Sequence, residues 1–441
     1  MAAAASVDPR LWWDGFGALM DRIRPRFARY EPFRHAAALL QGLMSGLDRK
    51  NCWTIAEAQG ARTPDGMQNL LSRASWDADG VRDDLLDYVI EAFGDPGAVL
   101  IIDETGDLKK GTHSVGVQRQ YTGTAGRIEN SQVAVYLTYA APRGHAFIDR
   151  ALYVPKSWTQ DQARCAAAGI PPETTFATKP QLAKTMISRA VQRKTPASWV
   201  TGDEVYGADP HLRAAIRGHG LGYVLMVAAT HTVPTHRGPL RAEAIAKTLP
   251  ARAWQRASAG AGSKGPRYYS WARIVLLAEE NPAGTAPIAG PAGGVHHLLI
   301  RRNDTTGEIA YLRTYSPRPA PLAKLIAVAG QRWRIEENFQ AAKGLTGLDQ
   351  HQVRRWTSWH RWTTLAMLAH AFLAVTTATE RNRNAAPADM IDLSVNELRR
   401  LFDALLLGPH HTPNRILAWS NWRRRHQACA RDCHYRAREN P

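Results

Sequence analysis

The stretch AVLIID, residues 98–103, decides how the core of this chain is expected to fold. Its apolar residues run without interruption and stop at Asp103. An unbroken apolar run of this length is typical of a strand that is buried on both faces of a sheet. We therefore predict a central strand over these residues that ends at the acid.

Strands and helices are predicted to follow this run along the chain. Two stretches, SQVAVYLTYA (131–140) and HAFIDRALYV (145–154), indicate strands joined by a turn. A helix, a strand, a helix and a strand then follow, at residues 179–192, 199–203, 209–220 and 222–230. Three consecutive strands followed by alternating helices and strands indicate a mixed sheet covered by helices, which places the chain in the α+β fold class.

The flanking segments complete an expected division of the chain into five parts. Residues 1–97 show apolar side chains at helical spacing and predict a helical DNA-binding region, and residues 98–230 form the first part of the core. Residues 231–319 lose the helical rhythm and predict a β-rich insertion. Core helices return in residues 320–380, and residues 381–441 form a basic helical tail.

Residues 51–76, within the first region, form two short helical patterns around a glycine-containing turn. Such a pair is typical of a helix-turn-helix DNA reader. It is equally typical of an ordinary helical hairpin, and both interpretations stay open from the sequence.

The chain of 441 residues carries a large positive charge. Its 56 Lys and Arg residues exceed its 39 Asp and Glu residues, for a formal net charge of +17 and an isoelectric point near 10.0. Such an excess repels itself unless a polyanion compensates it. Nucleic acid is the first candidate and an anionic membrane surface the second, while an arginine-rich proteome would explain the charge without any partner.

Cysteine usage and hydropathy indicate the compartment. The cysteines are too few and too scattered for a disulfide framework: Cys52, Cys165, Cys429 and Cys433. The N-terminal residues show no basic segment followed by an apolar core, as a signal peptide would. The most apolar stretch, residues 362–378, is short for a membrane span and predicts a buried helix. We expect a soluble cytoplasmic protein without membrane contact.

Two aspartates are expected to meet at one edge of the predicted sheet. Asp103 ends the first strand, and Asp203 ends the strand WVTGD at residues 199–203. If those strands are parallel neighbours, both carboxylates emerge at the same edge. Two ionised carboxylates a few ångströms apart repel each other, and a divalent metal removes that penalty. Mg²⁺ prefers such a site, because it leaves room for water and substrate phosphate around the ion.

A third acid is predicted on the helix RWRIEENFQAAKG, residues 332–344. Arg332, Glu336 and Lys343 are spaced four and then seven residues apart, so they lie along one stripe of the helix. An acid flanked by two bases on one face can hold a metal while the bases bind neighbouring phosphates. Glu337 lies about 100° further round the helix and competes with Glu336 for this role.

Four blocks of the sequence resemble the DDE transposases of bacterial insertion sequences, in particular the branches called IS-four and IS-seven-oh-one. The blocks are IIDETGDLKKG (101–111), VGVQRQYTGTAGRIENSQVAVYL (115–137), TGDEVYG (201–207) and RWRIEENFQAAKGLTGLDQHQVR (332–354). The resemblance covers about residues 30–375. The family signature has a tyrosine three residues before the helix arginine, where this chain has Ala329.

The resemblance implies an RNase H-like catalytic core, with Asp103, Asp203 and Glu336 as its acids and Arg332 and Lys343 as accessory bases. It also implies two Mg²⁺ ions, replaceable by Mn²⁺, that bridge the acids. The implied reaction is an in-line attack on phosphorus, which first cuts DNA at the element's end and then joins that end to target DNA. Double-stranded DNA and a homodimer or larger assembly are the implied partners.

Further DNA contacts are predicted outside this set. Lys109 and Lys110 follow the first acid in a glycine-rich stretch, and Arg119 lies in the next block, where such cations suit phosphate oxygens. Trp254 and Trp271 in the β-rich insertion are candidates for stacking on a flipped base, although buried aromatics are commoner.

The basic tail holds two further candidates. The run Arg423, Arg424 and Arg425 is predicted to contact phosphates. The histidines and cysteines that follow it allow zinc as an alternative, although their spacing is not that of a zinc finger: His426, Cys429, Cys433 and His434.

Rival functions share the predicted fold or the predicted DNA affinity. A stand-alone nuclease on the RNase H-like fold would cleave DNA without joining it. A domesticated DNA-binding regulator would bind a specific site and would not need Asp103 or Asp203. All three acids are present, which favours an active transposase. A hydrolase that uses the acids as an acid/base pair gives no role to the positive charge.

Overall fold

The computed structural model describes residues 7–262, 265–279, 282, 294–384, 391–408, 422 and 433. The chain forms two compact units. One combines residues 1–84 with residues 341–441 and is helical where it is described, and the other is residues 85–340 and contains the large sheet. Two helices, α5 (Ala78–Phe93) and α13 (Trp333–Thr346), run across the boundary between them.

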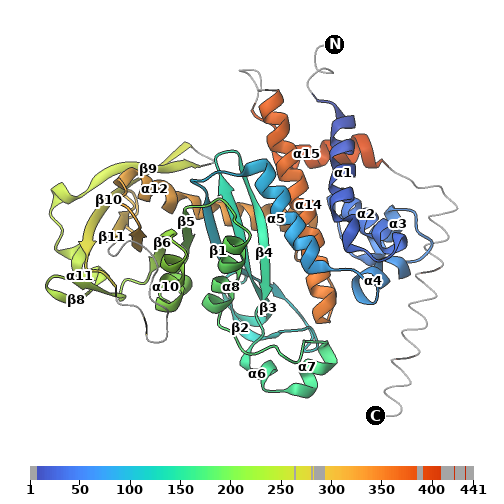
Figure 1. Cartoon of the computed structure of the whole chain (residues 1–441), viewed down its shortest axis with the longest axis horizontal. Coiled ribbons are helices and arrows are strands. Elements are labelled where there is room, and N and C mark those ends of the chain that lie inside the picture. Colours follow the sequence, from blue (N-terminus) through green and yellow to red (C-terminus); the bar gives the residue numbers. More distant parts are fainter. Residues whose placement is uncertain are drawn as a thin grey trace. The chain divides into compact units, whose positions relative to one another are not determined.

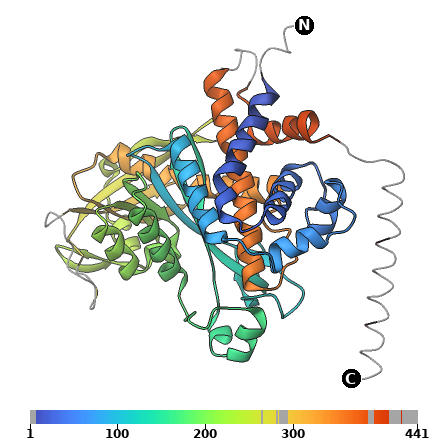
Figure 2. The ribbon, with the colours of Figure 1, turned by 45° about the vertical axis from the view of Figure 1, so that its right-hand side comes forward.

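The helical unit is built around α14, which is 28 residues long. Its other helices are α1 (Pro9–Ile23), α2 (Tyr30–Met44), α3 (Cys52–Ala58), α4 (Asp65–Ser72) and α15 (Val395–Phe402). Helices α1, α2, α4 and α15 all contact α14 (Figure 2). Phe372 of α14 packs edge-on against Phe16 of α1 and Phe402 of α15.

Helix α14 (Trp356–Arg383) is the buried helix predicted over residues 362–378. Among the described residues it is the one helix that is long and apolar enough to cross a membrane by length and composition alone. Its most apolar stretch is 94% buried inside the protein, because the surrounding helices cover it. This burial is that of a core helix.

The two short helices predicted over residues 51–76 are α3 and α4. Asn51 begins α3 by accepting hydrogen bonds from the backbone of Trp53 and Thr54, and Thr54 returns a bond in a capping box. Gly60, in the connection to α4, has a left-handed φ of 78° that suits glycine. Both helices pack on α2. The helical pair is therefore present, and its role as a DNA reader stays a prediction.

The sheet of the second unit begins with an antiparallel meander and continues with parallel strands. The order β4-β3-β1-β5-β6 has β3 and β4 antiparallel to their neighbours and β5 and β6 parallel to β1. The strands are β1 (Val99–Leu108), β3 (Arg127–Ala141), β4 (Gly144–Leu152), β5 (Trp199–Gly202) and β6 (Gly222–Val227). This is the mixed sheet expected of an RNase H-like core (Figure 1).

Helices connect the parallel strands and cover the sheet. Between β4 and β6 lie α6 (Lys156–Thr159), α7 (Gln162–Ala168), α8 (Lys179–Gln192), α9 (Glu204–Gly207) and α10 (Pro210–Gly218). Thr178 caps α8 in a capping box, and Asp209 caps α10 with Pro210 at its first position. The predicted α+β class is confirmed by this arrangement.

Residues 231–319 add strands to the same sheet. Beyond β6 the order continues β12-β11-β10-β9, all antiparallel to their neighbours. The elements of this segment are β7 (Thr232–Thr235), β8 (Gly238–Arg241), α11 (Ala242–Lys247), β9 (Gln255–Gly262), β10 (Gly265–Leu276), β11 (Val295–Arg302) and β12 (Ile309–Ser316). The β-rich insertion therefore extends the core sheet.

Strand β1 does not end at Asp103, so that prediction was wrong. It continues to Leu108 because β3 pairs with it along its whole length, from Val99–Ala140 to Leu108–Ser131. Only the parallel pairing with β5 ends there, at the pair Ile102–Gly202. Asp103 is thus a mid-strand residue at the position where one neighbouring strand stops.

The core helices predicted in residues 320–380 begin with two helices that meet at Arg332. Helix α12 (Leu322–Gln331) ends at Arg332, and α13 begins at Trp333. Gly330 lies so close to β9 that a Cβ there would overlap the backbone carbonyl of Ala259. A glycine is therefore needed where α12 packs on the extended part of the sheet.

A buried ion cluster joins α10 to the extended part of the sheet. Arg213 and Arg217 of α10 and Arg313 of β12 all contact the carboxylate of Glu279. The side chains of these arginines are 2–4% exposed, and that of Glu279 is 11% exposed. One carboxylate thus balances three buried guanidinium groups.

Candidate active site

The two predicted aspartates lie side by side at the edge of the sheet. In the parallel ladder of β1 and β5, Ile102 is the partner of Gly202, so Asp103 is the next residue on β1 and Asp203 directly follows β5. Asp203 begins α9 by accepting a hydrogen bond from the backbone N–H of Val205 at 2.9 Å. The expected parallel neighbours are therefore present, and they bring the two carboxylates together.

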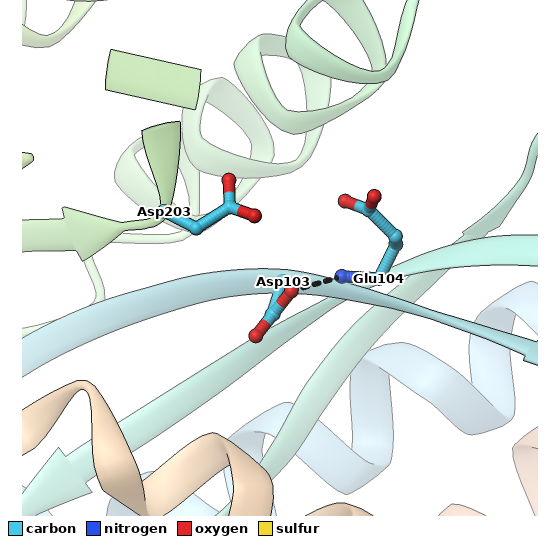
Figure 3. Close-up of side chains that lie close together, drawn as sticks. All are labelled: Asp103, Glu104 and Asp203. Atoms are coloured by element: carbon cyan, nitrogen blue, oxygen red, sulfur yellow. Dashed lines mark hydrogen bonds between the residues drawn. The ribbon is translucent and has the colours of Figure 1, made fainter. Parts of the chain in front are cut away.

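Glu104 joins these aspartates. Carboxylate oxygens of Asp103, Glu104 and Asp203 all lie within 4.8 Å of one another. Figure 3 shows the side chains of Asp103 and Glu104 pointing to different sides of β1, while the backbone N–H of Glu104 donates to Asp103 at 2.8 Å. Glu104 was not among the acids predicted from the sequence, because neighbouring residues in a strand face opposite sides of a sheet. The two adjacent acids in IIDE, residues 101–104, were the sequence signal from which Glu104 could have been predicted.

Two side chains hold Glu104 in place. Lys179, at the start of α8, donates to Oε1 of Glu104 at 2.6 Å. The buried Tyr206 of α9 donates its hydroxyl to Oε2 at 2.5 Å. Burial and the nearby Glu104 carboxylate raise the pKa of Tyr206 well above its usual value, so the phenol stays a donor. Glu104 therefore connects the acid cluster to α8 and α9.

Burial and neighbouring acids raise the pKa values of the two aspartates. Burial and the charges of Asp203 and Glu104 raise the pKa of Asp103 to about 7, against a smaller opposing effect of Arg332. Burial and Glu104 also raise the pKa of Asp203. A divalent cation would relieve this repulsion, and carboxylate oxygens are the ligands that Mg²⁺ and Mn²⁺ prefer. The residues present therefore fit such an ion.

Arg332, at the junction of α12 and α13, links Asp103 to Glu336. Its guanidinium lies 3.6 Å from Oδ2 of Asp103 and 2.7 Å from Oε1 of Glu336. Glu336 lies outside the group of three acids whose oxygens are within 4.8 Å of one another. The predicted third acid is thus connected to the first through a shared arginine.

Glu337 turns away from the acids. Its carboxylate lies 3.3 Å from Nε2 of His145 on β4 and accepts a hydrogen bond from Arg334 at 2.8 Å. The hydrogen bond from His145, followed by that from Arg334, lowers the pKa of Glu337 to about 2. The neighbouring Asn338 also bonds to β3, through Thr138 at 3.0 Å. These contacts give Glu337 a structural role in fastening α13 to the sheet.

The predicted phosphate-binding bases lie at three places, namely on α13, directly after β1, and on β2. Lys343 is on α13, in the part of that helix that belongs to the helical unit. Lys109 directly follows β1 and its backbone N–H donates to Asn130, and Lys110 beside it is exposed. Arg119 is exposed on β2 (Gln118–Thr122). Their contacts with DNA stay predictions.

The two insertion tryptophans have different surroundings. Trp271 is 1% exposed, and its indole N–H donates to the carbonyl of Ala257 at 3.2 Å. It lines a hollow of about 50 Å³ beside Arg332, which has room for a few water molecules and not for a nucleobase. Base stacking on Trp271 is therefore not available in this structure, and its role is that of a core aromatic. Trp254 is half-buried, with the guanidinium of Arg302 4.4 Å above its ring.

The tail candidates are outside the part of the chain that the structure describes. This applies to Arg423, Arg424, Arg425, His426, Cys429 and His434. Cys433 is described and is exposed. The phosphate-contact and zinc interpretations of the tail both stay predictions.

Acidic side chains gathered at the edge of a mixed sheet are suited to hold a divalent metal, as enzymes that act on phosphate esters with a metal ion require. The family model described as DDE superfamily endonuclease matches residues 22–266, more than half of the chain. The chain therefore belongs to this family. Membership implies the use of a divalent metal, which the acid cluster fits.

Comparison with individual proteins gives two further likenesses. The chain is 28% identical over 211 residues to a protein of Microchaete diplosiphon described as the probable transposase for insertion sequence element IS701, covering 47% of this chain and 52% of that protein. It thus spans about half the length of this curated relative. The structure is also similar to the piggyBac transposase in a synaptic complex with hairpin DNA, solved by cryo-EM, with a TM-score of 0.38 and 12% identity, covering 94% of this chain and 88% of that one.

Proposed function

We propose that this protein is a DNA transposase that cleaves the ends of an insertion sequence and joins them to target DNA. The observation that carries the proposal is the meeting of Asp103 on β1 with Asp203, which directly follows the parallel neighbour β5, in a chain of the DDE endonuclease family. The likeness to the IS701 protein and the net charge of +17 support DNA as the substrate. The protein acts on double-stranded DNA in the cytoplasm, as a homodimer or larger assembly that pairs two ends.

Asp103, Asp203 and Glu336 would hold the metal, with Glu104 as the competing third acid because its oxygens are nearest to the two aspartates. A bound Mg²⁺ or Mn²⁺ supplies a Lewis acid and a water of lowered pKa. Hydrogen bonds from the backbone N–H groups of Glu104 and Val205 orient the two aspartates toward their shared edge.

Arg332 positions the reacting phosphate. Its guanidinium lies between two carboxylates in this structure, and its planar set of donors suits phosphate oxygens equally well. A DNA phosphate that approaches Asp103 therefore meets a cation already held at the acids. Lys109 and Lys110, which follow β1 beyond the acids, bind flanking phosphates.

The proposal is tested by incubating the protein with end-labelled DNA that carries the gene's own flanks, in Mg²⁺ or Mn²⁺. We expect cuts at the element's ends and, with a target duplex present, joined products. Cuts without joined products would identify a stand-alone nuclease. Tight binding of the flanks without any cut, and equal binding by Asp103→Asn, would identify a DNA-binding regulator.

The third acid is expected to be Glu336. Glu336→Gln should reduce cleavage by at least about a hundredfold and weaken Mn²⁺ binding in calorimetry, because it removes a ligand carboxylate. Glu337→Gln is the matched control on the same helix and should keep Mn²⁺ affinity, because its partner is His145. If Glu104→Gln abolishes Mn²⁺ binding while Glu336→Gln leaves it unchanged, Glu104 is the third acid instead.

A further inference from the structure

The β2–β3 hairpin exposes an apolar pair. Tyr121 of β2 and Ile128 of β3 are direct partners across the hairpin, and they are 63% and 58% exposed. Cross-strand aromatic and β-branched pairs stabilise a hairpin, but these two also present apolar surface to the solvent. Arg119, two residues before Tyr121, lies on the same side of β2 and is exposed. Its side chain has no ion-pair partner among the residues the structure describes.

The tip of this hairpin lies beside the acids. The hydroxyl of Thr124 in the turn is 3.4 Å from that of Thr105, which is two residues after Asp103 on β1. Thr122 is buried against Gly106, where an added Cβ would overlap the threonine hydroxyl. Glycine within a strand often marks such a close approach of another segment. The contact keeps the hairpin next to the position where a reacting phosphate must lie.

DNA is the partner that fits this surface. A strand cut or bent at the acids presents base faces and backbone phosphates within reach of the hairpin tip. Base faces stack on aromatic rings and pack on apolar side chains, and phosphates attract an unpaired arginine. The chain's charge of +17 favours a polyanion over an apolar protein surface.

We propose that Arg119, Tyr121 and Ile128 form a DNA-binding surface next to the active site, here called the hairpin surface. Tyr121 and Ile128 pack against bases that are unstacked beside the cut phosphate, and Arg119 binds a backbone phosphate of the same strand. The inference rests on the proposed function, because it takes DNA as the substrate. It adds a recognition element that acts on DNA shape and does not touch the acids.

The test uses the full chain and two fluorescent duplexes, one carrying the gene's flank with a nick and one of mixed sequence. Fluorescence anisotropy should show that Tyr121→Ala weakens binding of the nicked duplex about tenfold, while Tyr121→Phe, which keeps the ring, binds like wild type. Ile128→Ala should weaken it a few-fold. Val275→Ala, a matched change of an exposed β-branched residue on β10, should have no effect.

Arg119→Gln should lower the slope of log affinity against log salt by about one, and Arg119→Lys should restore it.

A photo-crosslinking residue at position 121 gives an independent readout that does not depend on cleavage. Crosslinks to the nicked duplex from position 121, and none from position 275, are expected. If Tyr121→Ala binds the nicked duplex with unchanged affinity and position 121 gives no crosslink, the proposal that the hairpin surface binds DNA is wrong, even where wild type cuts and joins DNA. If wild type never cuts its flanks but Tyr121→Ala still weakens binding and position 121 crosslinks, the hairpin surface stands and the transposase proposal fails.

Discussion

Asp103→Asn is expected to reduce DNA cleavage by at least about a thousandfold, which corresponds to the several kcal/mol that a metal ligand contributes to the transition state. DNA affinity should not fall, because a carboxylate repels phosphate and the basic residues that bind DNA are unchanged. Cleavage of flank DNA and anisotropy of the same duplex measure the two effects separately. Glu308→Gln, an exposed acid on the sheet unit away from the cluster, should cleave like wild type.

The same substitution should stabilise the protein in the absence of divalent metal. The pKa of Asp103 is raised from 3.8 to about 7 by burial and by the neighbouring acids. A carboxyl group whose pKa is raised by folding destabilises the folded state as pH rises above its pKa in the unfolded chain. The full penalty is present above its pKa in the folded protein. Removing the charge should therefore raise the free energy of unfolding by about 2 kcal/mol at pH 8 and by much less at pH 4.

Denaturant unfolding in EDTA at these two pH values checks this second effect. Mg²⁺ should raise the midpoint of wild type and have little effect on Asp103→Asn, because the ion offsets the same repulsion. An Asp103→Asn protein that is less stable than wild type at pH 8 in EDTA would contradict the electrostatic account of the cluster. Retained cleavage by the same variant would remove Asp103 from the active site.

Glu279→Gln is expected to lower the free energy of unfolding by about 3–5 kcal/mol, the usual cost of leaving a buried charge without its partner. Glu279 is the carboxylate that Arg213, Arg217 and Arg313 share, and their side chains are almost completely buried. A glutamine keeps the shape and loses the charge, so the guanidinium groups repel each other without compensation. Glu243→Gln, whose partner Arg241 is 64% exposed, should cost less than about 1 kcal/mol.

The pH dependence of stability gives a second readout of Glu279. Its pKa is lowered from 4.5 to about 2 because hydrogen bonds and charges of the arginines outweigh the effect of burial. A carboxyl group whose pKa is lowered by folding stabilises the folded state, and this stabilisation is fully present above its pKa in the unfolded chain. It is lost as pH falls from about 4.5 towards 2. Wild type should lose this contribution in that window and Glu279→Gln should not. Equal stability of the two proteins at pH 7 would show that the cluster does not need the carboxylate.

Local patterns were sufficient to predict the positions of the core strands and the two aspartates. Apolar runs end near Asp103 and Asp203, because a strand that is buried on both faces of a sheet needs an apolar residue at nearly every position. The apolar stretch over residues 362–378, which is short for a membrane span, likewise predicted the buried helix α14. The sequence left the parallel pairing of the two strands as a condition, and the structure meets it with the ladder of β1 and β5.

The finer structure of the active site depends on partners far away in the sequence. His145 of β4 contacts Glu337, whereas Glu336 shares Arg332 with Asp103. The helix pattern places these two glutamates only about 100° apart and contains no information about β4. In the same way, β3 continues the pairing of β1 past Asp103, and thereby brings Glu104 into the cluster.

The sequence by itself therefore determined the fold class, the positions of the core strands and the two aspartates near the ends of their apolar runs, because these depend on the periodicity of burial within short segments. Only the tertiary structure decided that β9–β12 extend the core sheet, that Trp271 is a core residue, and that Arg332 lies between Asp103 and Glu336. These features depend on hydrogen bonds and ion pairs between residues distant along the chain. Such contacts form in three dimensions and leave no periodic signal in either segment.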